Sequence, residues 1–242
     1  MAIGKGAKVI SLSLGGELQG SVEDDPQCRF IELHKSDAIF VVAVGNSGPK
    51  PWTIGTPGAA PDAITVGAWS SHYKSIASFS SRGPQGAWYE DNTETLVDQA
   101  QQLGANIYKP DMVAPGGGPG SILVAPPGQI PVPYDEEIDG PPDMILSGVT
   151  GWTDGMQDLT PGDGFDFMRG SSMATPLAAG LIAYAYDRGL ISSAQEVKDL
   201  MAESVVNTPN LMYGFAQDDI PVKDPRVGFG MITLSRLGGN RD

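Results

Sequence analysis

One stretch of this chain, Gly170–Pro176, places two serines between a glycine and an apolar run with helical spacing, Leu177–Tyr186. A glycine at that point lets another backbone approach closely, because it has no Cβ atom. The start of a helix leaves backbone N–H groups without partners and carries the positive end of the helix dipole. A serine in this setting has the surroundings that a nucleophile needs, with donors beside the oxyanion that its attack on a carbonyl creates.

The seven residues Gly-Ser-Ser-Met-Ala-Thr-Pro closely resemble the nucleophile signature of the subtilisin-like serine proteases (subtilases, peptidase S8 family). By position in that signature Ser172 is the nucleophile, and Ser171 stands where the family has threonine. Gly-Ser-Ser alone is a common loop sequence. The prediction therefore depends on the whole heptapeptide and on the helical run that follows it.

Further segments resemble the same family in the same order, between about residue 5 and residue 234. They are Lys8–Gly16, Val41–Gly48, Pro57–Ala68, Ala77–Pro84, Lys109–Gly116 and Gly228–Ile232. The resemblance implies an α/β fold of three layers, in which helices flank a mostly parallel central sheet.

The resemblance also assigns residues to a peptide-binding site. Asn46 would donate its side-chain amide to the oxyanion, together with the backbone N–H of Ser172. One substrate-binding segment would pair edgewise with an extended polypeptide, and it consists of Ser13, Leu14, Gly15 and Gly16. A second segment would form the opposite wall of the site, and it consists of Ala43, Val44 and Gly45. The two glycines leave room for the substrate residue that precedes the cut, whose identity the sequence leaves open.

The family's other two catalytic groups are missing from this pattern. In the family an aspartate and a histidine in a His-Gly-Thr context both precede the Ser-Leu-Gly-Gly segment, so both are expected upstream of Met1. The chain contains only His34 and His72, and neither is followed by Gly-Thr. The chain therefore resembles the C-terminal two-thirds of a subtilase catalytic domain, and we expect it to be inactive without the missing segment.

Two other interpretations compete with a serine endopeptidase. The first is a catalytically inert subtilase-like module that binds peptides or is only structural, which the absent aspartate and histidine favour. The second is a sedolisin-type acid peptidase, which has an aspartate at the oxyanion position. Asn46 and the Met-Ala-Thr-Pro sequence after Ser172 argue against the sedolisin.

No repeat or domain-scale linker divides residues 1–242, and the resemblance implies that they form one partial subtilase catalytic domain. Strands are expected over 8–14 and 38–44 with a helix between them, which Asp25 caps and Pro26 begins. Short strands over 63–68 and 111–114 follow, and a capping box at Ser193–Glu196 starts a late helix. Two polar or Gly/Pro-rich stretches, 85–108 and 117–166, are predicted to be surface insertions.

Composition limits the partners. A net charge of −14 disfavours nucleic acids and anionic membranes, and no apolar run approaches the roughly 20 residues that span a bilayer. The serine protease chemistry that the resemblance implies needs no cofactor. Acidic clusters at 23–25, 90–98 and 135–143 leave room for a structural calcium ion, although none has EF-hand spacing. Cys28 is the single cysteine, so no intrachain disulfide forms. A secreted or extracytoplasmic location is implied by the resemblance alone.

We predict that the 242-residue chain is only marginally stable. If the family's early strands and helix are absent, the strands beginning at Lys8 and Ala38 expose a hydrophobic face and an unpaired edge. Calorimetry should show unfolding or aggregation below roughly 60 °C, within the usual range of mesophile domains. A cooperative transition above that temperature would contradict the prediction.

Overall fold

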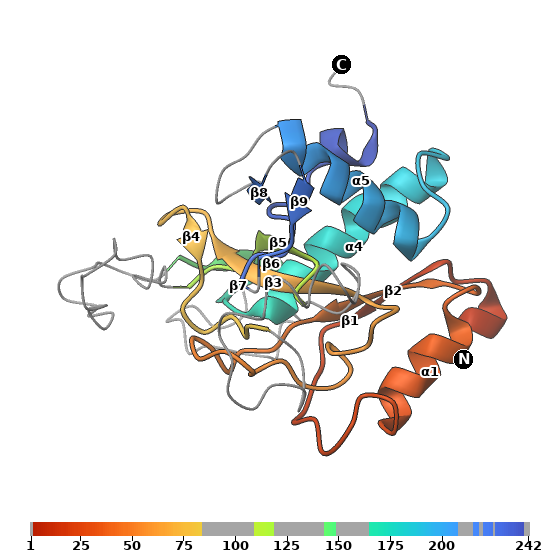
Figure 1. Cartoon of the computed structure of the whole chain (residues 1–242). Coiled ribbons are helices and arrows are strands. Elements are labelled where there is room, and N and C mark those ends of the chain that lie inside the picture. The colour runs from red at the N-terminus through yellow and green to blue at the C-terminus, as the bar shows by residue number, and fades with distance from the viewer. Residues whose placement is uncertain are drawn as a thin grey trace.

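The fold was analysed on a computed structural model of the whole chain (Figure 1). The structure describes residues 2–83, 109–118, 143–148, 165–207, 215–217, 220–224 and 226–239. Predicted insertion 85–108 and most of insertion 117–166 lie outside these residues, as do the acidic cluster 90–98 and nearly all of 135–143.

A mainly parallel sheet forms the centre of the structure. Strands β1 (Val9–Leu12), β2 (Ile39–Ala43), β3 (Ile64–Ser70) and β5 (Met112–Pro115) lie side by side in that order and run in the same direction. The short β4 (Ser75–Ile76) is antiparallel to the end of β3. All residues of β2 and β3 are buried, which explains why β2 is a continuous apolar run and why neither strand alternates between apolar and charged residues.

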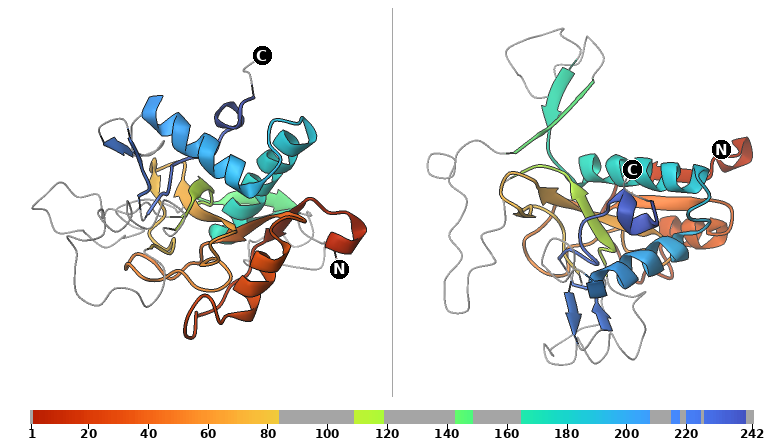
Figure 2. Two further views of the ribbon diagram at one scale, coloured as in Figure 1. Left: turned by 45° about the vertical axis from the view of Figure 1, so that its right-hand side comes forward. Right: turned by 90° about the horizontal axis from the view of Figure 1, so that it is seen from above.

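Helices cover both faces of this sheet (Figures 1 and 2). Helix α1 (Pro26–His34) lies on one face, whereas α4 (Ser171–Asp187) and α5 (Ala194–Asn207) lie on the other. Shorter elements are η1 (Ile3–Lys5), η2 (Leu234–Leu237) and two antiparallel strand pairs, β6 (Ile145–Gly148) with β7 (Phe165–Met168) and β8 (Phe215–Gln217) with β9 (Ile220–Val222). The predicted three-layer α/β fold is confirmed.

Alternate residues of β2 pack into two different cores. Ile39 and Val41 contact the apolar side chains of α4 and α5, whereas Phe40 and Val42 pack with Cys28 and other residues around α1. This alternation follows from strand geometry, because successive side chains point to opposite faces of a sheet. Burial of both sets fixes the register of β2 between its neighbours.

Local sequence signals place most helix starts correctly. Asp25 accepts hydrogen bonds from the backbone N–H groups of the second and third helical residues of α1, with Pro26 at the first position, as predicted. Before α5, the hydroxyl of Ser193 accepts from the N–H of Glu196 as a capping box requires. The Glu196 carboxylate, however, accepts from the N–H and hydroxyl of Ser192 rather than from Ser193.

The prediction that the two early strands expose an apolar face and an unpaired edge is only partly correct. The prediction that the strand beginning at Ala38 shows an apolar face is wrong, because α1 covers one of its faces and α4 covers the other. Strand β1 pairs with β2 alone among the described residues, so its outer edge is open. Beside β1 lies an apolar hollow of about 370 Å³ whose lining includes Ile3, Ile10 and Phe30.

No described helix is long and apolar enough to cross a membrane. Within the described residues no three His, Cys, Asp or Glu side chains gather as a metal site would require. In the cluster 23–25, Asp25 caps α1 and Asp24 accepts from Ser21. The structural calcium ion therefore stays a prediction.

A buried carboxylate ties the sheet to the C-terminal part of the chain. Asp111 is fully buried and accepts hydrogen bonds from the ammonium group of Lys109 at 2.6 Å, from the backbone N–H of Thr65 at 2.7 Å and from Lys223. Burial alone would raise the pKa of Asp111, but Lys109 and Lys223 outweigh it and hold that pKa well below its usual range. A depressed carboxyl pKa stabilises the fold above the unfolded value of 3.8, and this contribution is lost as the pH falls through the lower folded value.

We expect Asp111→Asn to destabilise the chain by about 3–5 kcal/mol, because it leaves two buried ammonium groups without their counter-charge. Urea unfolding followed by circular dichroism measures this loss. Asp37→Asn is the matched control, since it removes a carboxylate from an exposed pair with His34 and should cost about 1 kcal/mol or less. Equal effects of the two substitutions would contradict the structural importance of Asp111.

Candidate active site

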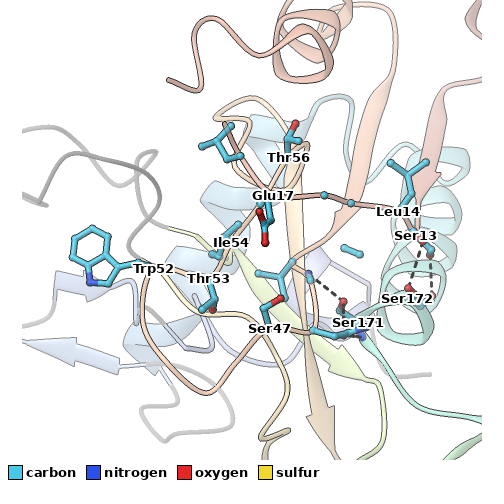
Figure 3. Close-up of a pocket in the computed structure, with 18 of the residues that line it drawn as sticks. Ser13, Leu14, Glu17, Ser47, Trp52, Thr53, Ile54, Thr56, Ser171 and Ser172 are labelled. Carbon is cyan, nitrogen blue, oxygen red and sulfur yellow. Dashed lines mark hydrogen bonds between the residues drawn. The ribbon is translucent and has the colours of Figure 1, made fainter. Parts of the chain in front are cut away.

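A groove of about 1160 Å³ opens at the carboxyl ends of β1 and β2, where helix α4 begins (Figure 3). Open α/β sheets bind ligands at this edge. All nine predicted site residues line the groove: Ser13, Leu14, Gly15, Gly16, Ala43, Val44, Gly45, Asn46 and Ser172. Sequence reasoning missed other lining residues, including Glu17, Trp52, Ile54, Thr56 and Ser171.

The start of α4 is set by Gly170. Its φ of 153° is a backbone conformation that residues with a Cβ rarely adopt, and a Cβ there would lie 3.3 Å from the side-chain nitrogen of Asn46. The helix begins directly after it, at Ser171, six residues before the apolar run from which the helix was predicted. Ser172 is thus the second helical residue, where the backbone N–H has no intrahelical partner.

Pro176 lies inside α4 and changes the hydrogen bonding of Ser172. A proline has no N–H, so the carbonyl four residues earlier, that of Ser172, loses its helical partner. The hydroxyl of Ser13 donates to this carbonyl at 2.8 Å instead. In return, the hydroxyl of Ser172 lies 3.4 Å from the carbonyl oxygen of Ser13. The first turn of α4 is therefore bonded to the segment that follows β1 (Figure 3).

Ser171 fixes the orientation of the Asn46 amide. The backbone N–H of Ser171 donates to Asn46 Oδ1 at 2.8 Å, and its hydroxyl donates to the same oxygen at 2.9 Å. The Ser171 hydroxyl in turn accepts from the N–H of Gly45 at 3.2 Å. Because a backbone N–H can only donate, Oδ1 must face Ser171 and the NH₂ group of Asn46 must face the other way. Sequence reasoning noted Ser171 as the variable position of the heptapeptide but gave it no role.

Two residues that line the groove, Gly16 and Thr56, are joined by backbone hydrogen bonds. Gly16 donates to the carbonyl of Thr56 at 2.9 Å and accepts from its N–H at 3.0 Å. The prediction that Gly16 pairs with an extended substrate is therefore wrong, because both of its backbone groups are already bonded. The N–H and C=O of Gly15 have no backbone partner among the described residues, so the pairing segment shortens to Ser13–Gly15.

Neither histidine of the chain lies in the groove. His34 is on α1, where its Nδ1 lies 2.8 Å from Asp37 and its ring packs on Phe30. His72 lies after β3, with its ring edge-on to Tyr73. No imidazole lines the described part of the groove, so none is placed to accept a proton from Ser172.

Comparison with known proteins agrees with the fold. The model of the subtilase family (peptidase S8) matches residues 1–216. Serine protease AprX of Bacillus subtilis is 31% identical over 202 residues, and pyrolysin of Pyrococcus furiosus is 29% identical over 235 residues. Among solved structures, sphericase superposes with a TM-score of 0.54 over 92% of this chain at 24% identity, a likeness of fold alone.

The chain is much shorter than these proteins. The matched part covers 80% of this chain but 36% of AprX, and 86% of this chain but 12% of pyrolysin. The superposition covers 56% of the sphericase chain.

The bond between Ser13 and the Ser172 carbonyl can be tested with a double-mutant cycle. Ser13→Ala alone should destabilise the chain by about 1 kcal/mol, because it leaves a carbonyl without a donor. In a Pro176→Ala background the new N–H can bond to that carbonyl, so Ser13→Ala should cost clearly less. Urea unfolding of the four variants gives the coupling, and a coupling near zero would show that Ser13 and Pro176 act independently.

Proposed function

The chain belongs to the subtilase family, and we propose that it forms the serine-bearing part of a serine endopeptidase that cuts peptide bonds through an acyl-enzyme on Ser172. Membership of the family supports serine protease chemistry in general. The roles of individual residues are our proposal and rest on the geometry of the groove.

The observation that carries the proposal is the amide of Asn46, whose oxygen is held by Ser171. Its NH₂ group donates no hydrogen bond to any described residue and borders the groove that Ser172 also lines. A donor fixed before the reaction stabilises developing charge without having to reorganise. Attack of the Ser172 hydroxyl on a carbonyl would give an oxyanion held by this NH₂ group and by the N–H of Ser172.

The substrate would lie as an extended strand along Ser13–Gly15, with its backbone paired to the unbonded groups of Gly15. Ala43–Gly45 would form the facing wall. The hydroxyl of Ser172 needs a base, because serine is a weak nucleophile near neutral pH. We propose that an aspartate and a histidine from a segment upstream of this chain supply that base. The partners are thus a polypeptide substrate and that segment.

Peptide binding without turnover is a second candidate function. The absence of an imidazole from the described part of the groove favours it for the 242-residue chain alone. In this case the groove would still hold an extended peptide, and the Ser172 hydroxyl would remain unactivated.

We place the protein outside the cytoplasm, since one relative, 33% identical over 107 residues, is named minor extracellular protease Vpr. The reaction proposed for Ser172 needs no cofactor. A calcium ion would have a structural role only.

Phosphonylation tests the proposed chemistry. The full chain is treated with a fluorophosphonate with and without added imidazole, which can act as a soluble substitute for the missing base. Mass spectrometry of the peptides should show an adduct on Ser172 that forms faster with imidazole. Asn46→Ala should slow formation of the adduct. The slowing should not exceed about 10²–10³, which is the known loss of turnover in a subtilisin without this donor.

Two controls make the result specific. Ser172→Ala should remove the adduct, and Ser36, which is exposed in the turn after α1, gives the rate of an ordinary serine in the same chain. If a folded chain reacts at Ser172 no faster than at Ser36, even with imidazole, the endopeptidase proposal fails and binding without turnover remains.

A further inference from the structure

The groove has a single charged group among its described lining residues, the carboxylate of Glu17. This side chain is exposed and has no hydrogen bond or ion pair with the rest of the described structure. Figure 3 shows it extending from the segment after β1 toward the side where Thr53, Ile54 and Ser47 lie. No lysine, arginine or histidine lines the described part of the groove to neutralise it.

Glu17 emerges from a rigid part of the groove. The residue before it, Gly16, is bonded through both backbone groups to Thr56, at 2.9 and 3.0 Å. A side chain at Gly55 would collide with the Gly16 carbonyl, so the two backbones are in direct contact. The position at which the Glu17 side chain leaves the backbone is therefore fixed before a ligand binds, which lowers the entropic cost of forming an ion pair.

The groove that Glu17 lines also contains Ser172, and several of the residues that line it are small. Gly15 and Gly16 have no side chains to fill it, and Ala43 and Val44 on the facing wall are small, apolar and almost fully buried. A long side chain that enters between the two walls could lay its methylene groups along this apolar surface and bring its polar end to the carboxylate. Lysine and arginine combine such a stem with a cationic head.

We propose that Glu17 makes the groove select substrates with lysine or arginine at the residue that precedes the cleaved bond. The inference rests on the proposed function, because it assumes that a peptide lies along Ser13–Gly15. An ion pair at an exposed site adds little free energy, so the expected preference is about two- to fivefold. It should shrink as salt rises, because mobile ions screen an exposed pair.

Binding of two matched peptides tests the inference without requiring turnover. The full chain carrying Ser172→Ala is titrated with acetyl-Ala-Ala-Ala-Lys-amide and with the norleucine analogue, which keeps the methylene stem and lacks the charge. Calorimetry should give a Kd for the lysine peptide about two- to fivefold below that for the norleucine peptide. The difference should fall toward none when Glu17→Gln is added.

A control removes the effect of the overall charge. The chain carries −14 and attracts any cationic peptide at long range, so Glu32→Gln, which removes an exposed carboxylate on α1 outside the groove, should leave the preference unchanged. Glu17→Lys should reverse it in favour of a glutamate peptide. Circular dichroism of each variant verifies folding.

The outcomes separate the two proposals. Equal binding of the lysine and norleucine peptides, or a lysine preference that survives Glu17→Gln, overturns the role of Glu17 and leaves the peptide-binding groove in place. If the folded chain binds none of the peptides, the proposed function itself is overturned and the inference with it.

Discussion

The close packing of helix α4 on the central sheet is the interaction on which the site depends. The residues of α4 that face the sheet are mostly alanines, and Ala174, Ala178 and Ala185 are fully buried. Because this face consists mostly of small side chains, α4 approaches the sheet closely and contacts β1, β2, β3 and β5. This approach brings the N-terminus of the helix, and Ser172 with it, to the carboxyl edge of the sheet. Larger side chains on this face would push the helix away and open the groove.

The first turn of α4 is fixed by neighbouring segments more than by its own hydrogen bonds. Pro176 removes one bond of the helix, and the hydroxyl of Ser13 replaces it. Asn46 accepts two bonds from Ser171, at the position where the helix has orphan donors. The loops after β1 and β2 thus cap α4, and α4 in turn orients those loops. Ser172 and Asn46, which we propose as nucleophile and oxyanion donor, are therefore positioned by the same set of bonds.

Sequence reasoning predicted the elements that have a local cause. The apolar run of β2 and the capping of α1 by Asp25 are visible in the chain itself, and the heptapeptide around Ser172 indicated the site through resemblance. It missed features that arise only when distant segments meet. The pairing of Gly16 with Thr56 joins residues 40 positions apart, and the bonds of Asp111 with Lys223 cross more than a hundred. No local pattern in the sequence marks such partners.

A serine protease needs both donors for the oxyanion and a base for the serine hydroxyl, and the described groove differs in how it meets these two requirements. Stabilising an oxyanion needs donors fixed in place, and in our proposal these are the Asn46 amide, oriented by Ser171, and the N–H of Ser172 at the start of α4. Accepting a proton needs a base, which this part of the chain lacks within the groove. Among the described residues, the edge of β1 that has no partner strand lies beside an apolar hollow, and the chain runs directly from β1 to Ser13 in the groove. A segment that paired with this edge of β1 would reach the groove beside Ser13, which is where the base that we propose for Ser172 would have to enter.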